Sequence, residues 1–299
     1  MSVSHSGVYP IMGRELSKRL SSKRLSTDDP FVDVDNEHGE PFLDWKHPLN
    51  VHPWYFAHQA LRADFKDNIA ALDKMIAAIE IGVYCRYLGT STSIHYINLL
   101  TNRWMTQNYM KFTSIQMEFL HHHHEMEDAV MFPLMTKKMA IDPQLGKEHE
   151  DVALRLNAID KKTKALLSSP NLLDSYKEIR AEMVALRDVL EPHLQEEELK
   201  LLPALLRKFT HDEIDAVEQP AIKSFPWFML PHFYRRLTKI ERESHMTDIL
   251  GIPKFVQNLI LAGNFKKYQG MYADCIDELN NPDLREENMK RKASSCVIA

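Results

Sequence analysis

From Trp54 to about residue 208, apolar residues recur every three or four positions, the spacing that places side chains on one face of an α-helix. The 299-residue chain holds only nine glycines, and signals for β-strands are absent from this region. The sequence therefore predicts an all-α protein. A hydrophobic content of 44% is ample for a packed core.

Residues that favour turns divide the periodic region into four long segments. The segments cover about 54–86, 94–140, 144–167 and 172–208, and the breaks fall at 88–93, 142–143, 168–171 and 209–212. The second segment is long enough to form two helices, and the sequence does not place a joint within it. Long helices joined by short loops predict an up-down four-helix bundle.

The regions outside the four segments differ from them in composition. The N-terminal region is poor in apolar residues and rich in Ser, Arg, Lys and Asp, so it cannot offset the entropy of ordering. Beyond Gln219, prolines and glycines allow only short helices. We predict a disordered basic and Ser-rich arm over 1–45, the bundle over 46–212, a helical C-terminal extension over 213–282 and a flexible tail over 283–299.

Each long segment carries a histidine on its apolar stripe, and two segments also carry a glutamate there. Burying imidazoles and carboxylates among leucines costs free energy unless they are paired or coordinated. The stripes hold no Lys or Arg, whereas a pair of metal ions would satisfy both kinds of group. The stripes are His58, Leu61, Phe65, Ile69, Leu72, Ile76 and Ile79; Phe112, Ile115, Phe119, His123, Glu127, Val130 and Leu134; His149, Val152, Leu156, Ile159 and Leu166; and Met183, Leu186, Leu190, His193, Glu197, Leu201 and Leu205.

A short motif occurs twice in the chain. The pattern H-x3-E-D-x4-P begins at His123, and H-x3-E-E-x4-P begins at His193. A spacing of four residues puts the histidine and the glutamate one turn apart on one helix face. Each copy is preceded, one helix earlier, by a stripe histidine, so the repeat indicates a duplicated helical hairpin.

On these residues the chain resembles the hemerythrin-like, or HHE cation-binding, family over about 54–208. The family motif runs H-x-x-x-E-[DE] with an aliphatic residue and a proline following. The resemblance implies a helical hairpin duplicated into a four-helix bundle around a di-iron centre. Carried over residue by residue, it implies His58, His123, His149 and His193 as terminal ligands and Glu127 and Glu197 as bridging carboxylates.

Two positions depart from the pattern of the oxygen-carrying hemerythrins. Those proteins add a histidine one turn after the third-helix ligand, and here the residue four positions after His149 is Ala153. They also often take the last carboxylate five residues after the fourth-helix histidine, which is Glu198 here. We expect Glu197 because it lies on the stripe and matches the other copy, and Glu198 stays as the alternative.

The donor count bears on the chemistry of the site. Four imidazoles and two bridging carboxylates give about eight bonds to two metals, whereas iron in nitrogen and oxygen surroundings takes five or six bonds each. Two ferrous ions also bring four positive charges against two negative ones. We therefore expect two non-haem, carboxylate-bridged iron ions that bind dioxygen, peroxide or hydroxide at the metal centre.

Three functions remain open at this stage. The first is a di-iron protein that binds or senses iron or oxygen species, with reversible oxygen carriage disfavoured by Ala153. The second is an enzyme with the same centre, namely an oxidase, ferroxidase or peroxidase. The third is a membrane-tethered adaptor whose metal site is structural or lost.

Other histidines lack these features. In the run 121–124 only His123 falls on the stripe, so we expect His121, His122 and His124 to lie outside the ligand set. Core or surface roles are expected for five further histidines that lack a matched carboxylate. They are His52, His95, His211, His232 and His245.

The remaining sequence features concern location and partners. A net charge of −5 gives no overall attraction to nucleic acid. Three distant cysteines and the absence of a secretory signal indicate a cytoplasmic protein. The final residues Cys296-Val-Ile-Ala299, with Lys and Arg upstream, are typical of a farnesylation site, which would attach the protein to an anionic membrane surface. A repeated Lys-Arg-Leu-Ser sequence makes Ser21 and Ser26 candidate phosphorylation sites.

Overall fold

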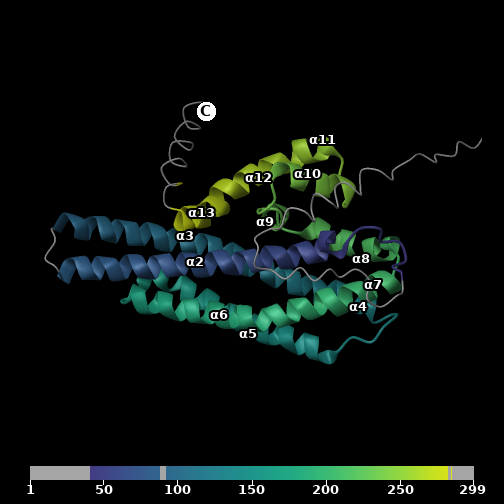
Figure 1. Cartoon of the computed structure of the whole chain (residues 1–299), viewed down its shortest axis with the longest axis horizontal. Coiled ribbons are helices and arrows are strands. Elements are labelled where there is room, and N and C mark those ends of the chain that lie inside the picture. The colour runs from purple at the N-terminus through teal and green to yellow at the C-terminus, as the bar shows by residue number, and fades with distance from the viewer. Residues whose placement is uncertain (1–40, 88–91, 282–283, 285–299) are drawn as a thin grey trace, which may run out of the picture.

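The computed structural model describes residues 41–87, 92–281 and 284, and these residues form helices and loops without any strand (Figure 1). The all-α prediction is confirmed. Within these residues, no helix combines the length and the apolar character needed to cross a membrane. The candidate modification sites Ser21, Ser26 and Cys296 lie outside the described residues.

Four long helices form the bundle, and in Figure 1 they run side by side along its length. The α2–α3 hairpin reaches well past the ends of α5 and α6 (Figure 1). The second predicted segment is one continuous helical path, because α3 passes through a π-helical turn into α4 without a loop. The fourth segment does the same through α6, η4 and α7. The elements are α2 (Pro53–Tyr87), α3 (Thr92–Met126), η2 (Glu127–Met131), α4 (Phe132–Met135), α5 (Pro143–Lys164), α6 (Leu172–Glu196), η4 (Glu197–Leu201) and α7 (Leu202–Lys208).

The second hairpin begins and turns at residues that suit helix ends. The Asp142 side chain accepts a hydrogen bond from the backbone N–H of Gln144, and Pro143, which needs no N–H partner, occupies the first turn of α5. Asn171 accepts a hydrogen bond from the N–H of Asp174 at the start of α6. These caps fix the starts of α5 and α6, close to the predicted breaks at 142–143 and 168–171.

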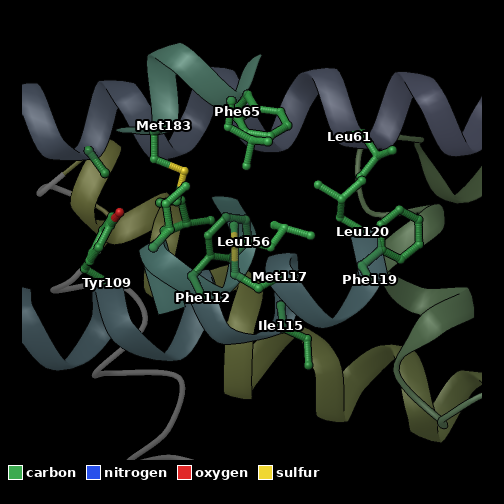
Figure 2. Packing of buried hydrophobic residues seen from close by; sticks show 14 of the residues in the cluster. Leu61, Phe65, Tyr109, Phe112, Ile115, Met117, Phe119, Leu120, Leu156 and Met183 are labelled. Atoms are coloured by element: carbon green, nitrogen blue, oxygen red, sulfur yellow. The ribbon is translucent and has the colours of Figure 1, made fainter. Parts of the chain in front are cut away.

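The larger hydrophobic cluster fills the middle of the bundle (Figure 2). Leu61 and Phe65 of α2 lie opposite Phe112 and Leu120 of α3, and Leu156 of α5 lies between the helices (Figure 2). All five side chains are at most 5% exposed. Burial on this scale supplies most of the free energy that stabilises a bundle of this kind.

A second, smaller cluster closes the end of the bundle at which α4, α7 and α8 meet (Figure 1). Every bundle helix, or the helical segment that continues it, contributes at least one residue to this cluster. These residues are Trp54, Met131, Leu134, Leu145, Leu201, Leu205 and Phe209. The two clusters therefore divide every long helix into two apolar parts. The residues between these parts form a polar layer across the bundle.

The C-terminal extension packs along α2 and α3 (Figure 1). Its residues Phe228, Tyr268, Ile276 and Leu279 belong to the larger hydrophobic cluster. The extension therefore shares a core with the bundle. Its elements are α8 (His211–Ser224), α9 (Met229–Phe233), α10 (Lys239–Asp248), α11 (Lys254–Val256), η5 (Gln257–Leu261), α12 (Ala262–Tyr268), η6 (Gln269–Ala273) and α13 (Asp274–Asn280), and short 3₁₀ helices lie at η1 (Leu49–Val51) and η3 (Leu166–Ser168).

A buried polar network joins the extension to α2. Asp64, which is fully buried, lies 2.6 Å from Nε2 of His232 and accepts a hydrogen bond of 2.7 Å from Arg235. Nδ1 of His232 in turn lies 2.6 Å from the hydroxyl of Tyr268. His232 thus has a structural role, as the sequence suggested, and the network fixes how α9 and α12 sit on the bundle.

Candidate metal centre

Ionisable side chains from four helices meet in the layer between the two hydrophobic clusters. On α2 the order along the helix is Trp54, His58 and Leu61, so the imidazole lies between one residue of the smaller cluster and one of the larger cluster. On α5 the order is Leu145, His149 and Val152. The same alternation occurs on α3 and α6, so all four helices bring their polar residues to one level.

Two groups of side chains in this layer have the spacing of metal sites. Their ligand atoms lie within 4.8 Å of one another in each group, and both groups contain Glu127. The first group is His58, His123, Glu127 and Glu197, and the second is His124, Glu127, His149 and His193. The six residues predicted as ligands thus lie together, and the structure adds His124 to them.

Glu127 and Glu197 each present one carboxylate oxygen to the histidines of the first group and the other oxygen to those of the second. Oε1 of Glu127 lies 3.2 Å from Nε2 of His123, whereas Oε2 lies 3.7 Å from Nε2 of His149. Oε2 of Glu197 lies 3.4 Å from Nε2 of His58, whereas Oε1 lies 3.4 Å from Nε2 of His193. This division of the oxygens suits two carboxylates that bridge a pair of cations.

Several buried atoms in this layer lack a hydrogen-bond partner among the described residues. Such atoms are costly to bury, because each has lost water without gaining a partner. They are Nε2 of His58, His123 and His124, Oε2 of Glu127 and both carboxylate oxygens of Glu197. A pair of cations would satisfy all six atoms together, so the residues fit the group that the sequence implies.

The pair His149 and His193 gives the same indication. Their Nε2 atoms lie 3.0 Å apart. Nδ1 of His149 lies 2.8 Å from a carboxylate oxygen of Asp128, and Nδ1 of His193 lies 3.0 Å from one of Glu148. If each Nδ1 donates its proton to its acid, both Nε2 lone pairs point at each other. A cation held by both nitrogens would satisfy the two lone pairs together.

The pKa values of the layer reflect its burial. Loss of solvent lowers the pKa of His58, His123 and His124 well below the ordinary value, and nearby positive groups lower it further. Burial raises the pKa of Glu127 and Glu197 well above the usual range, and at Glu197 the charge of Glu127 adds to the effect. Burial therefore favours the neutral form of these three imidazoles, which is the form that binds metal, and the two carboxylates favour a cationic partner.

The acid that follows each of the two glutamates contacts a histidine across the bundle. Asp128 follows Glu127 and contacts Nδ1 of His149, the stripe histidine of the other hairpin. Glu198 follows Glu197, and its Oε1 lies 3.0 Å from Nδ1 of His58. The repeated motif therefore supplies both a carboxylate inside the layer and an acid that orients a histidine of the other hairpin.

The position of Glu198 bears on the alternative left open by the sequence. Its two oxygens accept hydrogen bonds from Arg62, and Arg62 also donates to Glu191. Glu198 thus has its own cation, whereas the Glu197 oxygens have no partner among the described residues. The geometry favours Glu197 as the ligand and gives Glu198 the supporting role.

π-helical turns begin at both bridging glutamates. In each turn the N–H of the residue before the motif proline donates to the glutamate carbonyl five positions earlier, Phe132 to Glu127 and Leu202 to Glu197. The following proline has no N–H and hinders a regular helical bond, which explains why the extra residue is inserted there. One consequence is that Met131 replaces the predicted Val130 on the buried face.

The histidine run splits between the site and the surface. His121 and His122 are more exposed and lie 3.1 Å from Glu125, as expected for residues outside the ligand set. His124, which was also expected to lie outside the ligand set, is only 6% exposed and lies among the residues of the second group. A signal was present in the sequence, because Met117, Leu120 and His124 form a second stripe at helical spacing.

Trp54 also contacts Glu127, although no pattern in the sequence marked it as part of the site. The indole Nε1 of Trp54 donates a hydrogen bond of 2.6 Å to Oε1 of Glu127. Trp54 is 8% exposed and belongs to the smaller hydrophobic cluster. It therefore holds the carboxylate from the apolar side of the layer.

Comparison with known proteins agrees with this geometry. A family model, the hemerythrin HHE cation-binding domain, matches residues 50–205, which is 156 of the 299 residues. No curated protein and no solved structure matches the chain at a significant level. The matched region contains all four bundle helices and every residue of both groups. The chain belongs to the hemerythrin HHE cation-binding domain family.

Proposed function

We propose that this protein holds two non-haem iron ions in the polar layer and uses them to bind or sense iron or oxygen species. The residues that would hold the pair are His58, His123, Glu127, His149, His193 and Glu197. Nitrogen and oxygen donors of this kind suit iron, and the family binds cations.

The observation that carries the proposal is the set of six buried atoms in one layer that have no hydrogen-bond partner within 41–87, 92–281 and 284. A folded protein keeps such atoms only where another requirement outweighs their cost. The supporting acids strengthen this argument, because Asp128, Glu148 and Glu198 direct the Nε2 atoms of three histidines inward.

The chemistry of the centre follows from charge and enclosure. Two ferrous ions would carry four positive charges against two from the bridging glutamates, so bound iron would supply a site for dioxygen or for a small anion such as hydroxide or peroxide. The two hydrophobic clusters on either side exclude water from the layer. Trp54 keeps one oxygen of Glu127 in place.

Metal analysis of the protein purified without chelators tests the proposal. We expect about two irons per chain in the wild type and a large loss in Glu127→Ala. Glu125→Ala is the matched control, because Glu125 lies half a turn away on the same helix and its side chain is 54% exposed. A wild-type protein that is folded, yet carries and takes up no metal, would contradict the proposal.

A further inference from the structure

We propose that His124 supplies a third imidazole to the cation position of His149 and His193, so that the two positions of the centre differ in their donors. The inference rests on the proposed function, and it extends the ligand set beyond the six residues that the sequence pattern identifies.

The position of His124 is that of a ligand. Its ligand atom lies within 4.8 Å of those of Glu127, His149 and His193. Its ring stacks on that of His149, with centroids 4.3 Å apart and an angle of 16° between planes, and it meets the ring of His193 edge-on. The three imidazoles thus come from three different helices and converge on one point.

A purely structural role does not explain Nε2 of His124. This atom is buried and has no hydrogen-bond partner among the described residues. Two buried histidines outside the layer, His232 and His245, make hydrogen bonds through both ring nitrogens. A core histidine is therefore satisfied elsewhere in this protein, and His124 differs because it faces the polar layer.

The sequence offers a reason for the arrangement. The residue one turn after His149 is Ala153, whose methyl group cannot bind a metal. α5 therefore supplies one imidazole to this position, and α3 supplies a further one through His124. His123 and His124 are adjacent, so they point in directions about 100° apart on the helix and serve the two different groups.

The donor sets of the two positions are consequently unequal. The position of His124, His149 and His193 receives three nitrogens and one oxygen from each glutamate, and the position of His58 and His123 receives two nitrogens and two oxygens. More donors give tighter binding, so we infer that the three-imidazole position fills first. Removal of His124 should weaken that position selectively.

Titration of the metal-free full-length chain with cobalt(II), followed by its visible absorption bands, tests the inference. The wild type should bind two equivalents in two distinguishable steps. In His124→Leu and in His124→Gln, the affinity of the first step should fall at least about tenfold, with a changed band pattern. His122→Leu is the control, because His122 is the neighbouring, more exposed histidine, and it should behave as the wild type.

The outcomes separate the two proposals. If the wild type binds no cobalt or iron, the proposed function is overturned together with this inference. If the wild type binds two ions and both His124 variants match it in affinity and spectrum, the inference alone is overturned. The Gln variant retains a polar side chain of similar size, and circular dichroism establishes that each variant is folded.

Discussion

Oε1 of Glu198 lies 3.0 Å from Nδ1 of His58, although the two residues belong to different halves of the duplicated sequence. Asp128 stands in the same relation to His149, at 2.8 Å. Each copy of the motif therefore orients a histidine of the other hairpin, and neither half is complete without its partner. An acid behind a ligand imidazole fixes its tautomer and makes Nε2 more basic.

Loss of this acid should weaken metal binding. We expect Glu198→Ala to lower the affinity for iron about 10- to 100-fold. Asp128→Ala should have a smaller effect, since the Asp128 side chain is 49% exposed and water can replace it. Calorimetric titration measures both. Glu196→Ala serves as the control, because Glu196 pairs with Lys200 on the surface. Equal affinities in all four proteins would argue against an orienting role.

Removal of the metal should lower the stability of the bundle. A ligand present at about 100 times its Kd adds about 2.7 kcal/mol to the free energy of unfolding. For a domain of this size, that corresponds to a fall in Tm of roughly 5–10 °C on chelation. Calorimetric scans with and without chelator measure the difference. The same treatment should leave the Tm of Glu127→Ala unchanged, and an equal shift in that variant would point to an unrelated effect of the chelator.

Glu197→Met should change stability in opposite directions with and without metal. Glu197 is fully buried, and neither of its carboxylate oxygens has a hydrogen-bond partner in the described part of the chain, so a similarly sized apolar side chain should stabilise the metal-free protein by about 1–3 kcal/mol. In the presence of iron the variant should be less stable than the wild type, because a bridging ligand is lost. Urea denaturation under both conditions gives the two values. A variant that is destabilised in both conditions would contradict this account of the layer.

The buried network at Asp64 should be strongly stabilising once formed. Asp64→Ala leaves Arg235 with Asp67 and His232 with Tyr268 alone, and breaking such a buried pair costs about 3–5 kcal/mol. Denaturation curves measure the loss. Asp73→Ala is the control on the same helix, since its pair with Arg180 is exposed and contributes at most about 1 kcal/mol. Similar losses in both variants would show that the network does not hold the extension.

Burial of His245 should make stability fall in mild acid. Burial lowers the pKa of His245 from 6.5 to about 4. In the folded protein its two ring nitrogens make hydrogen bonds with the Val51 carbonyl and the Tyr234 hydroxyl. Between pH 6.5 and 4 the unfolded chain therefore binds a proton that the folded protein excludes, so the free energy of unfolding decreases as pH falls. This single group accounts for roughly 3 kcal/mol over that range.

The comparison of the wild type with His245→Gln isolates this contribution. The variant lacks the titrating group, so the difference in stability between the two proteins should shrink steadily from pH 7 to pH 4. Urea denaturation at intervals across this range measures it. A difference that stays constant with pH would mean that His245 does not titrate in this way.

Local periodicity was enough to predict the all-α fold and to place six candidate ligand side chains on stripes that face inward. His58, His149 and His193 each lie on an apolar stripe, and a stripe must face the core wherever the helix packs. The duplicated motif added the glutamates at a spacing of one turn. These predictions needed only the geometry of an isolated helix.

Other features depended on how the helices pack. Adjacent positions on a helix point about 100° apart, so Glu197 and Glu198, or His123 and His124, can each border the same buried face. The choice is made by what lies opposite: Arg62 on α2 draws Glu198 outward, and His149 on α5 lies against His124. The helical pattern thus determined which residues face inward, and only the tertiary structure decided which of them converge, because convergence depends on atoms from distant parts of the chain.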